Sequence, residues 1–109
     1  MLPIKRLRDW LVADALPVWL EKGYDRQNQS FHERLNFDFT PITCDGKRVL
    51  VQARQVYTYL FFANSIDGAS DAAQSAFEFM YTKCRHPTGG WRHRVTREGA
   101  PLDDSRDLY

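Results

Sequence analysis

The segment VLVQARQVYTYLFFANSI, residues 49–66, is the stretch that decides the fold. Its apolar residues recur at helical spacing in two neighbouring stripes. One stripe is formed by Val49, Ala53, Val56, Leu60 and Ala63, and the other by Leu50, Tyr57 and Phe61. A helix that is apolar over most of its circumference must be covered on two sides. We therefore expect this helix to lie inside a layered all-α structure and not on the surface of a small bundle.

Arg54 lies within this apolar helix, four residues after Leu50 and three before Tyr57. A guanidinium carries five N–H donors, so among aromatic side chains it must pair with a carboxylate, stack on a ring or point into a polar cavity. The chemistry alone leaves two interpretations open. Arg54 forms a buried ion pair with a residue such as Glu33, or it is a cation that serves a binding site.

The segment before the central helix predicts an N-terminal helix. Pro3 suits a first helical turn, and the pattern then continues to near Gly23. Its apolar positions are Ile4, Leu7, Leu11, Ala15, Val18 and Trp19. Pro17 removes one backbone hydrogen bond, so we expect a kink there or a break into two short helices.

A third helix follows the central one. Ser70 or Asp71 can cap its start, and it should end before Pro87. Its predicted apolar stripe is Ala73, Ala76, Phe77, Met80 and Cys84. The sequence thus predicts about three helices.

Alternation with period two predicts two short β-hairpins. Residues 31–39 alternate as one strand, and Asp45-Gly46 supplies a turn after it. Residues 47–51 then either pair back as a second strand or lead directly into the central helix. Residues 91–96 alternate again before a turn at Glu98-Gly99, which indicates a second hairpin.

Length and composition exclude several classes of protein. The chain of 109 residues allows one small domain, and its formal net charge of +1 provides no field that would attract nucleic acid. The longest apolar run, residues 59–63, is too short to cross a membrane. Cys44 and Cys84 are isolated thiols that fit a reducing compartment. We expect a soluble cytoplasmic protein that binds neither nucleic acid nor membrane.

No motif for a metal or a cofactor is present. The stretch HERLN, residues 32–36, begins like a zinc-protease motif but has Asn36 in place of the second histidine, in a segment with strand periodicity. The histidines, His32, His86 and His93, show no metal-ligand spacing. Residues 91–97 mix basic and aromatic side chains, which a hairpin with a solvated basic face explains without nucleic acid. We expect no metal and no cofactor.

Four blocks together resemble the N-acylglucosamine 2-epimerase family, which also contains cellobiose 2-epimerases and mannose isomerases. The blocks are LPVW (16–19) with GYD (23–25), SFHERL (30–35), RVLVQARQVY (48–57), and GGW (89–91) with GAPL (99–102) and DLY (107–109). One departure is Gln29-Ser30, where the family usually has a glycine pair.

The resemblance implies a fold and a chemistry. The fold is an (α/α)6 barrel, of which residues 1–109 would form a single, incomplete N-terminal part of the six-hairpin domain. Family members move a proton at carbon 2 of an open-chain sugar through an enediolate, using a histidine pair in later helices. No catalytic residue is therefore expected within this chain. Arg54 resembles the arginine that contacts the reacting oxygens, and Tyr109 resembles a tyrosine of the sugar pocket.

Two functions follow as hypotheses. In the first, the chain is a segment of a sugar isomerase or 2-epimerase, with mannose–fructose isomerisation favoured, and is inactive by itself. In the second, it is a non-catalytic remnant or interaction module that pairs with another chain through its apolar helix. The expected partners are a small-molecule sugar and a second copy of the chain in a homo-oligomer.

Overall fold

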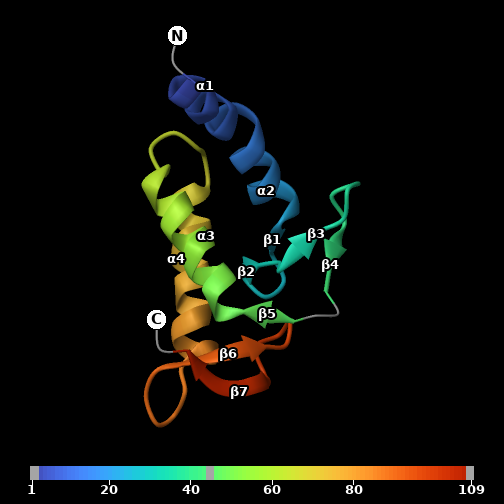
Figure 1. Ribbon diagram of the computed structural model, residues 1–109, viewed down its shortest axis with the longest axis vertical. Helices are drawn as coiled ribbons and strands as arrows, with labels where there is room; N and C mark the ends of the chain where they lie inside the picture. Colours follow the sequence, from blue (N-terminus) through green and yellow to red (C-terminus); the bar gives the residue numbers. More distant parts are fainter. Residues whose placement is uncertain (1–2, 44–45, 108–109) are drawn as a thin grey trace.

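The computed structural model describes residues 3–43 and 46–107, with residues 103–107 described by their backbone alone. Helices and short strands alternate along the chain (Figure 1). The helical elements are α1 (Pro3–Trp10), η1 (Leu11–Ala15), α2 (Leu16–Lys22), α3 (Val49–Phe61), α4 (Ala69–Phe79) and η2 (Met80–Cys84). The strands are β1 (Tyr24–Asp25), β2 (Ser30–Phe31), β3 (Arg34–Leu35), β4 (Pro41–Ile42), β5 (Lys47–Arg48), β6 (Trp91–Val95) and β7 (Pro101–Asp107).

The predicted helix-rich class is confirmed, with three helical stretches joined by short antiparallel strand pairs. β1 pairs with β2, β3 pairs with β4, and β6 lies between β5 and β7 in a small sheet. That sheet lies across the end of the helix pair where α3 begins and η2 ends (Figure 1). Among the described residues, no helix is both long and apolar enough to cross a membrane.

The predicted irregularity in the first helix is confirmed. Pro17 lies in the first turn of α2, and the π-helical turn η1 ends immediately before α2 begins. The N–H of Leu16 donates to the carbonyl of Leu11, five residues back. Because proline has no N–H, the regular hydrogen-bond ladder cannot continue through this point, and the wider turn accommodates the loss.

The strand predicted over residues 31–39 was wrong in its extent. Only β2 and β3 are extended, and residues 36–40 form a turn in which the Phe39 N–H donates to the Asn36 carbonyl. Asp38 accepts hydrogen bonds from both the N–H and the hydroxyl of Thr40. This side-chain turn chemistry overrides the alternating pattern. The alternative in which residues 47–51 pair back onto the strand before them is wrong, because β3 pairs with β4 and β5 pairs with β6. The other alternative is confirmed, since α3 begins directly after β5.

The core lies between α3 and α4, which pack side by side (Figure 1). From α3 it takes Val49, Val56 and Tyr59, with Gln52 buried among them. α4 and η2 contribute Ala69, Ala72, Ala73, Ala76, Phe79, Met80 and Cys84 to the core. The many alanines of α4 allow the two helix backbones to approach closely.

Two details of the third helix differ from the prediction. Its N-cap is Gly68, with φ at 81°, and not Ser70 or Asp71. Phe77 is half exposed, while Phe79 takes the buried position instead. The helix nevertheless ends before Pro87, as expected.

Only one side of α3 is covered within the described residues. Tyr57 and Phe61 are each 69% exposed, and Leu60 is 49% exposed. The expectation of two covered faces therefore does not hold for this chain by itself.

Candidate functional site

Arg54 projects from the exposed side of α3. The residue is exposed, and neighbouring Ala53 and Tyr57 on the same side are exposed as well. The rings of Tyr57 and Phe61 continue this surface along the helix, with their centroids 6.2 Å apart. The backbone carbonyl of Arg54 accepts a hydrogen bond from the Thr58 hydroxyl at 2.8 Å. The guanidinium thus lies at the start of an aromatic helix face that the described residues leave open.

The ion pair considered for Arg54 is not formed. Glu33 instead pairs with Arg48, the residue that precedes α3. One carboxylate oxygen accepts the Arg48 N–H at 2.9 Å, and the other accepts its Nε–H at 2.6 Å. The Glu33 side chain is only 5% exposed, so this contact fixes the beginning of α3 against the β2–β3 connection. Arg54 is consequently not used in a buried pair with Glu33.

The opposite side of α3 is held by Gln52 and Tyr59. The Gln52 carboxamide accepts the Phe31 N–H at 2.9 Å and donates to the Phe31 carbonyl at 2.5 Å. The Phe31 ring stacks on the Tyr59 ring, with centroids 5.2 Å apart and planes 7° apart. The Tyr59 hydroxyl donates to the Leu16 carbonyl at 2.7 Å. These contacts join α3 to β2 and α2 on the face away from Arg54.

A buried polar cluster joins the hairpins beneath α3. Lys47 is 1% exposed and Asp25 is 2% exposed. The Lys47 ammonium donates to Asp25 at 2.9 Å, to the Ser30 hydroxyl at 2.7 Å and to the Arg97 carbonyl at 3.0 Å. Asp25 also accepts from Arg97 and Asn28. All three ammonium donors have protein partners, so the cluster stabilises the contact between the hairpins and offers no open position to a ligand.

The electrostatics of this cluster follow from its partners. Burial alone would raise the pKa of Asp25, but hydrogen bonds from Lys47, Arg97 and Asn28 hold it well below its usual range. Burial holds the pKa of Lys47 below its usual value, and the hydrogen bond to Asp25 offsets only part of this lowering. A carboxylate and an ammonium held in this way remain a charged pair and do not act as a proton shuttle near neutral pH.

The three histidines lie in three separate segments: His32 follows β2, His86 follows η2 and His93 lies in β6. His32 is buried, and burial lowers its pKa. The Nδ1 atom of His86 lies 3.2 Å from the Thr88 N–H and 2.8 Å from the Thr88 hydroxyl oxygen, in a local turn. His93 lies half-buried in β6. Within residues 3–43 and 46–107, no three His, Cys, Asp or Glu side chains gather in a way that could hold a metal ion.

Cys84 is a buried thiol whose pKa burial raises to about 11. It therefore stays protonated at neutral pH and is no nucleophile. The other cysteine, Cys44, lies outside the described residues.

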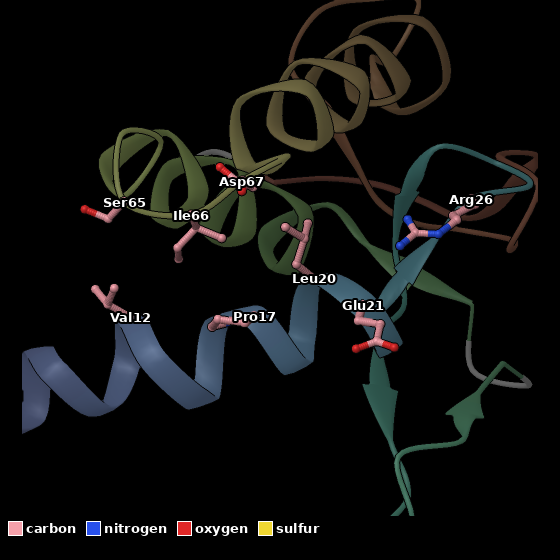
Figure 2. Close-up of a pocket in the computed structure, with 8 residues that line it drawn as sticks. All are labelled: Val12, Pro17, Leu20, Glu21, Arg26, Ser65, Ile66 and Asp67. Carbon is pink, nitrogen blue, oxygen red and sulfur yellow. The ribbon is translucent and has the colours of Figure 1, made fainter.

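A hollow of about 360 Å³ lies at the other end of α3, between α2 and the α3–α4 connection (Figure 2). Val12 and Ser65 lie at one end of it, and Glu21 and Arg26 at the other (Figure 2). Its remaining lining residues are Pro17, Leu20, Ile66 and Asp67. Arg54 does not line this hollow, and no histidine or cysteine does, so the space is separate from the surface around Arg54.

Sequence reasoning located one of the two candidate residues within the described structure. Arg54 lies on α3 as predicted, whereas Tyr109 lies outside the described residues. Neither Gln52 nor the cluster around Lys47 was predicted from the sequence. The only signal for Gln52 was its polarity in an apolar helix, and Lys47 gave none, because its partners are 17 to 50 residues away in the chain.

The comparisons with known proteins agree on one group of enzymes. The family model for N-acylglucosamine 2-epimerase (GlcNAc 2-epimerase) matches residues 30–109. A mannose-6-phosphate isomerase from Rhizobium meliloti (strain 1021) is 32% identical over 108 residues, which cover 94% of this chain and 27% of that protein. The crystal structure of a sugar epimerase from a ruminal bacterium is similar, with a TM-score of 0.81 and 25% identity over 96% of this chain and 28% of that one. The chain spans less than a third of either relative.

Proposed function

The chain belongs to the N-acylglucosamine 2-epimerase family, and from this premise we propose that it forms part of a sugar isomerase or 2-epimerase. Residues 1–109 would be the N-terminal, incomplete segment of an (α/α)6 barrel, with α3 as an inner helix and α4 outside it. The single observation that supports the proposal is the position of Arg54, which lies within the matched region and on the side of α3 that α4 and the hairpins leave uncovered.

Arg54 has a defined role in this reaction. Removing the proton from carbon 2 of an open-chain sugar creates an enediolate, whose oxygens carry developing negative charge. A guanidinium that is already oriented toward those oxygens stabilises the transition state more than the neutral substrate. Its planar set of donors can contact two neighbouring oxygens at once, as a carbonyl and an adjacent hydroxyl present them.

The proton transfer itself belongs to another part of the proposed enzyme. His32 is buried and His86 serves a turn, so neither is offered as the base. A histidine pair outside this chain would remove the proton and return it to carbon 1 or to the other face of carbon 2. The isolated chain of 109 residues is therefore proposed to be inactive. No metal or cofactor is required by this chemistry, and the cytoplasm is its proposed location.

We favour a mannose–fructose type of isomerisation. The name of the 32% identical relative, mannose-6-phosphate isomerase, supports mannose or its 6-phosphate as the first substrates to examine. The name of the similar structure, a sugar epimerase, keeps epimerisation at carbon 2 as the other outcome. The two reactions share the enediolate and differ only in the carbon that receives the proton.

The experiment compares this chain with the product of the complete reading frame that encodes it. Each is incubated with mannose or mannose 6-phosphate in heavy water, and NMR follows deuterium at carbon 2 and the appearance of ketose or epimer. We expect exchange by the complete product and none by the chain above a boiled control. Exchange by the isolated chain would contradict its proposed inactivity, and no exchange by the complete product on any aldose would contradict the function.

The exposed aromatic face of α3 favours a second candidate, a non-catalytic remnant or interaction module that forms a homo-oligomer. Tyr57 and Phe61 form an apolar surface of the kind that marks protein interfaces. This alternative predicts a stable oligomer of the isolated chain in analytical ultracentrifugation, which Phe61→Asp disrupts. A monomeric chain with a cooperative melting transition would count against it.

A further inference from the structure

The carboxamide of Gln52 occupies an unusual position for a polar side chain. Gln52 is 0% exposed, lies in the first turn of α3, and binds both main-chain groups of one residue, Phe31 in β2. On the other edge of β2 the strand pairs with β1. The Gln52 side chain therefore supplies the two hydrogen bonds that a neighbouring strand would supply to this edge of β2, because an amide presents a donor and an acceptor side by side.

The geometry of the helix relates this contact to Arg54. An α-helix turns by about 100° per residue, so Gln52 and Arg54 point about 200° apart, to nearly opposite sides of α3. Tyr59, seven residues after Gln52, returns to within about 20° of it. The contacts of Gln52 and Tyr59 with Phe31 thus fix the rotation of α3 about its axis.

We propose that Gln52 is a positioning residue, which sets the direction of the Arg54 guanidinium by fixing α3 to the main chain of β2. This inference rests on the proposed function. Tyr59 can hold the helix by ring stacking, but stacked rings slide, whereas two hydrogen bonds to the N–H and the carbonyl of one residue allow a single register and rotation. Both bonds are buried, and losing them leaves the Phe31 N–H and carbonyl without partners.

The test is a double-mutant cycle in the complete enzyme, followed by carbon-2 exchange of mannose in heavy water. We expect Gln52→Leu to lower kcat/KM by about tenfold or more, since a displacement of about 1 Å at a reacting centre has effects of up to about a hundredfold. In the Arg54→Met background the same substitution should have almost no further effect, because there is no guanidinium left to position.

Val56→Ala is the matched control. Val56 is buried on the same face of α3, one turn further on, and is 7% exposed. This variant should lose stability without losing kcat/KM, when all proteins are assayed well below their melting temperatures. Equal fold losses from Gln52→Leu in both backgrounds would show that Gln52 is merely structural and would overturn the inference.

A second variant keeps the test decisive if Gln52→Leu fails to fold. In Gln52→Glu, a carboxylate accepts the Phe31 N–H but places an oxygen against the Phe31 carbonyl. A protonated carboxyl group restores the missing donor, so activity relative to the unsubstituted enzyme should rise as the pH falls. A ratio that is independent of pH would contradict the inference. If Arg54→Met itself leaves the exchange rate unchanged, both the proposed function and the positioning role are wrong. If Arg54→Met lowers the rate but the effects of the two substitutions on kcat/KM are additive, only the positioning role is wrong.

Discussion

Single side chains from the hairpins determine where α3 starts and how it is oriented. The ammonium of Lys47 is the clearest case, because it lies in the interior with its three donors bound to Asp25, Ser30 and the Arg97 carbonyl. Breaking a buried ion pair is costly, since the remaining charge keeps its burial without its partner. The cluster therefore stabilises the join between β1, β2 and β5, from which α3 starts.

Removing the ammonium should strongly destabilise the chain. We expect Lys47→Met to lower the free energy of unfolding by about 3 kcal/mol, because Asp25 is left with the half-exposed Arg97 as its cationic partner. Lys22→Met is the control, since the Lys22–Glu21 pair is exposed and 3.9 Å apart, and it should change the free energy by less than about 0.5 kcal/mol. Urea denaturation of both variants measures the difference, and equal effects would contradict this account.

His32 should make the stability depend on pH. Burial and the nearby Lys47 and Arg97 cations lower its pKa, against the attraction of Asp25. Below about pH 6.5 the unfolded chain binds more protons than the folded chain, so stability is present above that pH and is lost as the pH falls. The lowered pKa of Asp25 adds a loss only below about pH 4.

The measurement is urea denaturation at about pH 7.5 and about pH 5. We expect the wild-type chain to be less stable at the lower pH and His32→Gln to show a smaller difference between the two. A wild-type chain that is more stable at the lower pH would contradict the assigned direction of the pKa shift.

Residue types alone could not predict these contacts. The helical position of Arg54 followed from periodicity, but its exposure did not, because an apolar helix gives no sign of which face its neighbours cover. Glu33 was one partner considered for Arg54 but pairs with Arg48, and the spacing of the residues does not tell which arginine lies beside it. Lys47 looks like an ordinary surface lysine, and only the folded chain brings Asp25 and Arg97 to it.

At the scale of elements, two glycines at positive φ allow the chain to turn into its strands and helices. Gly46 has φ at 72° before β5, and Gly68 has φ at 81° before α4. A Cβ added at Gly46 would lie 2.4 Å from the Val95 carbonyl oxygen, whereas one at Gly68 would have Leu20 Cδ2 as its neighbour at 3.8 Å. The two positions share a backbone conformation and differ in the space around them.

Alanine substitutions should separate these two effects. Gly68→Ala introduces only the strain of a left-handed conformation, so we expect a loss of about 1 kcal/mol. Gly46→Ala adds a clash with the backbone of β6, and its loss should be at least twice as large. Thermal unfolding of the two variants checks the order, and a Gly68→Ala variant as unstable as Gly46→Ala would show that space is not the difference.

Elements were predictable where periodicity and breakers agreed. The helix start at Pro3, the irregularity at Pro17 and the hairpin before and after Gly99 all follow from local chemistry. The strand over residues 31–39 failed because Asp38 and Thr40 form a turn inside an alternating pattern. The cap of α4 was missed because Gly68 acts through its backbone conformation and has no side chain to recognise.

At the scale of the whole molecule, the described chain is elongated and leaves apolar side chains exposed on two helices. It measures 49 × 28 × 23 Å, and α1 projects beyond the helix pair (Figure 1). Ile4 is 78% exposed on α1, and Leu7 and Trp10 are 55% and 53% exposed. Together with the open face of α3, these are surfaces that the proposed larger enzyme would cover.

One substitution distinguishes an open face from a covered one. In the isolated chain Phe61 is 69% exposed, so Phe61→Asp should change the free energy of unfolding by less than about 0.5 kcal/mol. In the complete enzyme the same change would bury a charge between helices and should cost about 2 kcal/mol or more. Chemical denaturation of both proteins gives the comparison, and equal effects in the two would argue against an inner position of α3.

The central claim is that Arg54 serves sugar chemistry, and the most direct measurement is the rate of deuterium incorporation at carbon 2 of mannose and mannose 6-phosphate in heavy water. We predict that Arg54→Met lowers this rate in the complete enzyme by about a hundredfold or more, the usual effect of losing one stabilising donor. Its melting temperature should not change, because Arg54 is exposed on α3. Arg8→Met, at another exposed arginine, on α1, should leave the rate unchanged. Equal rates for the Arg54→Met variant and the unsubstituted enzyme would contradict the account.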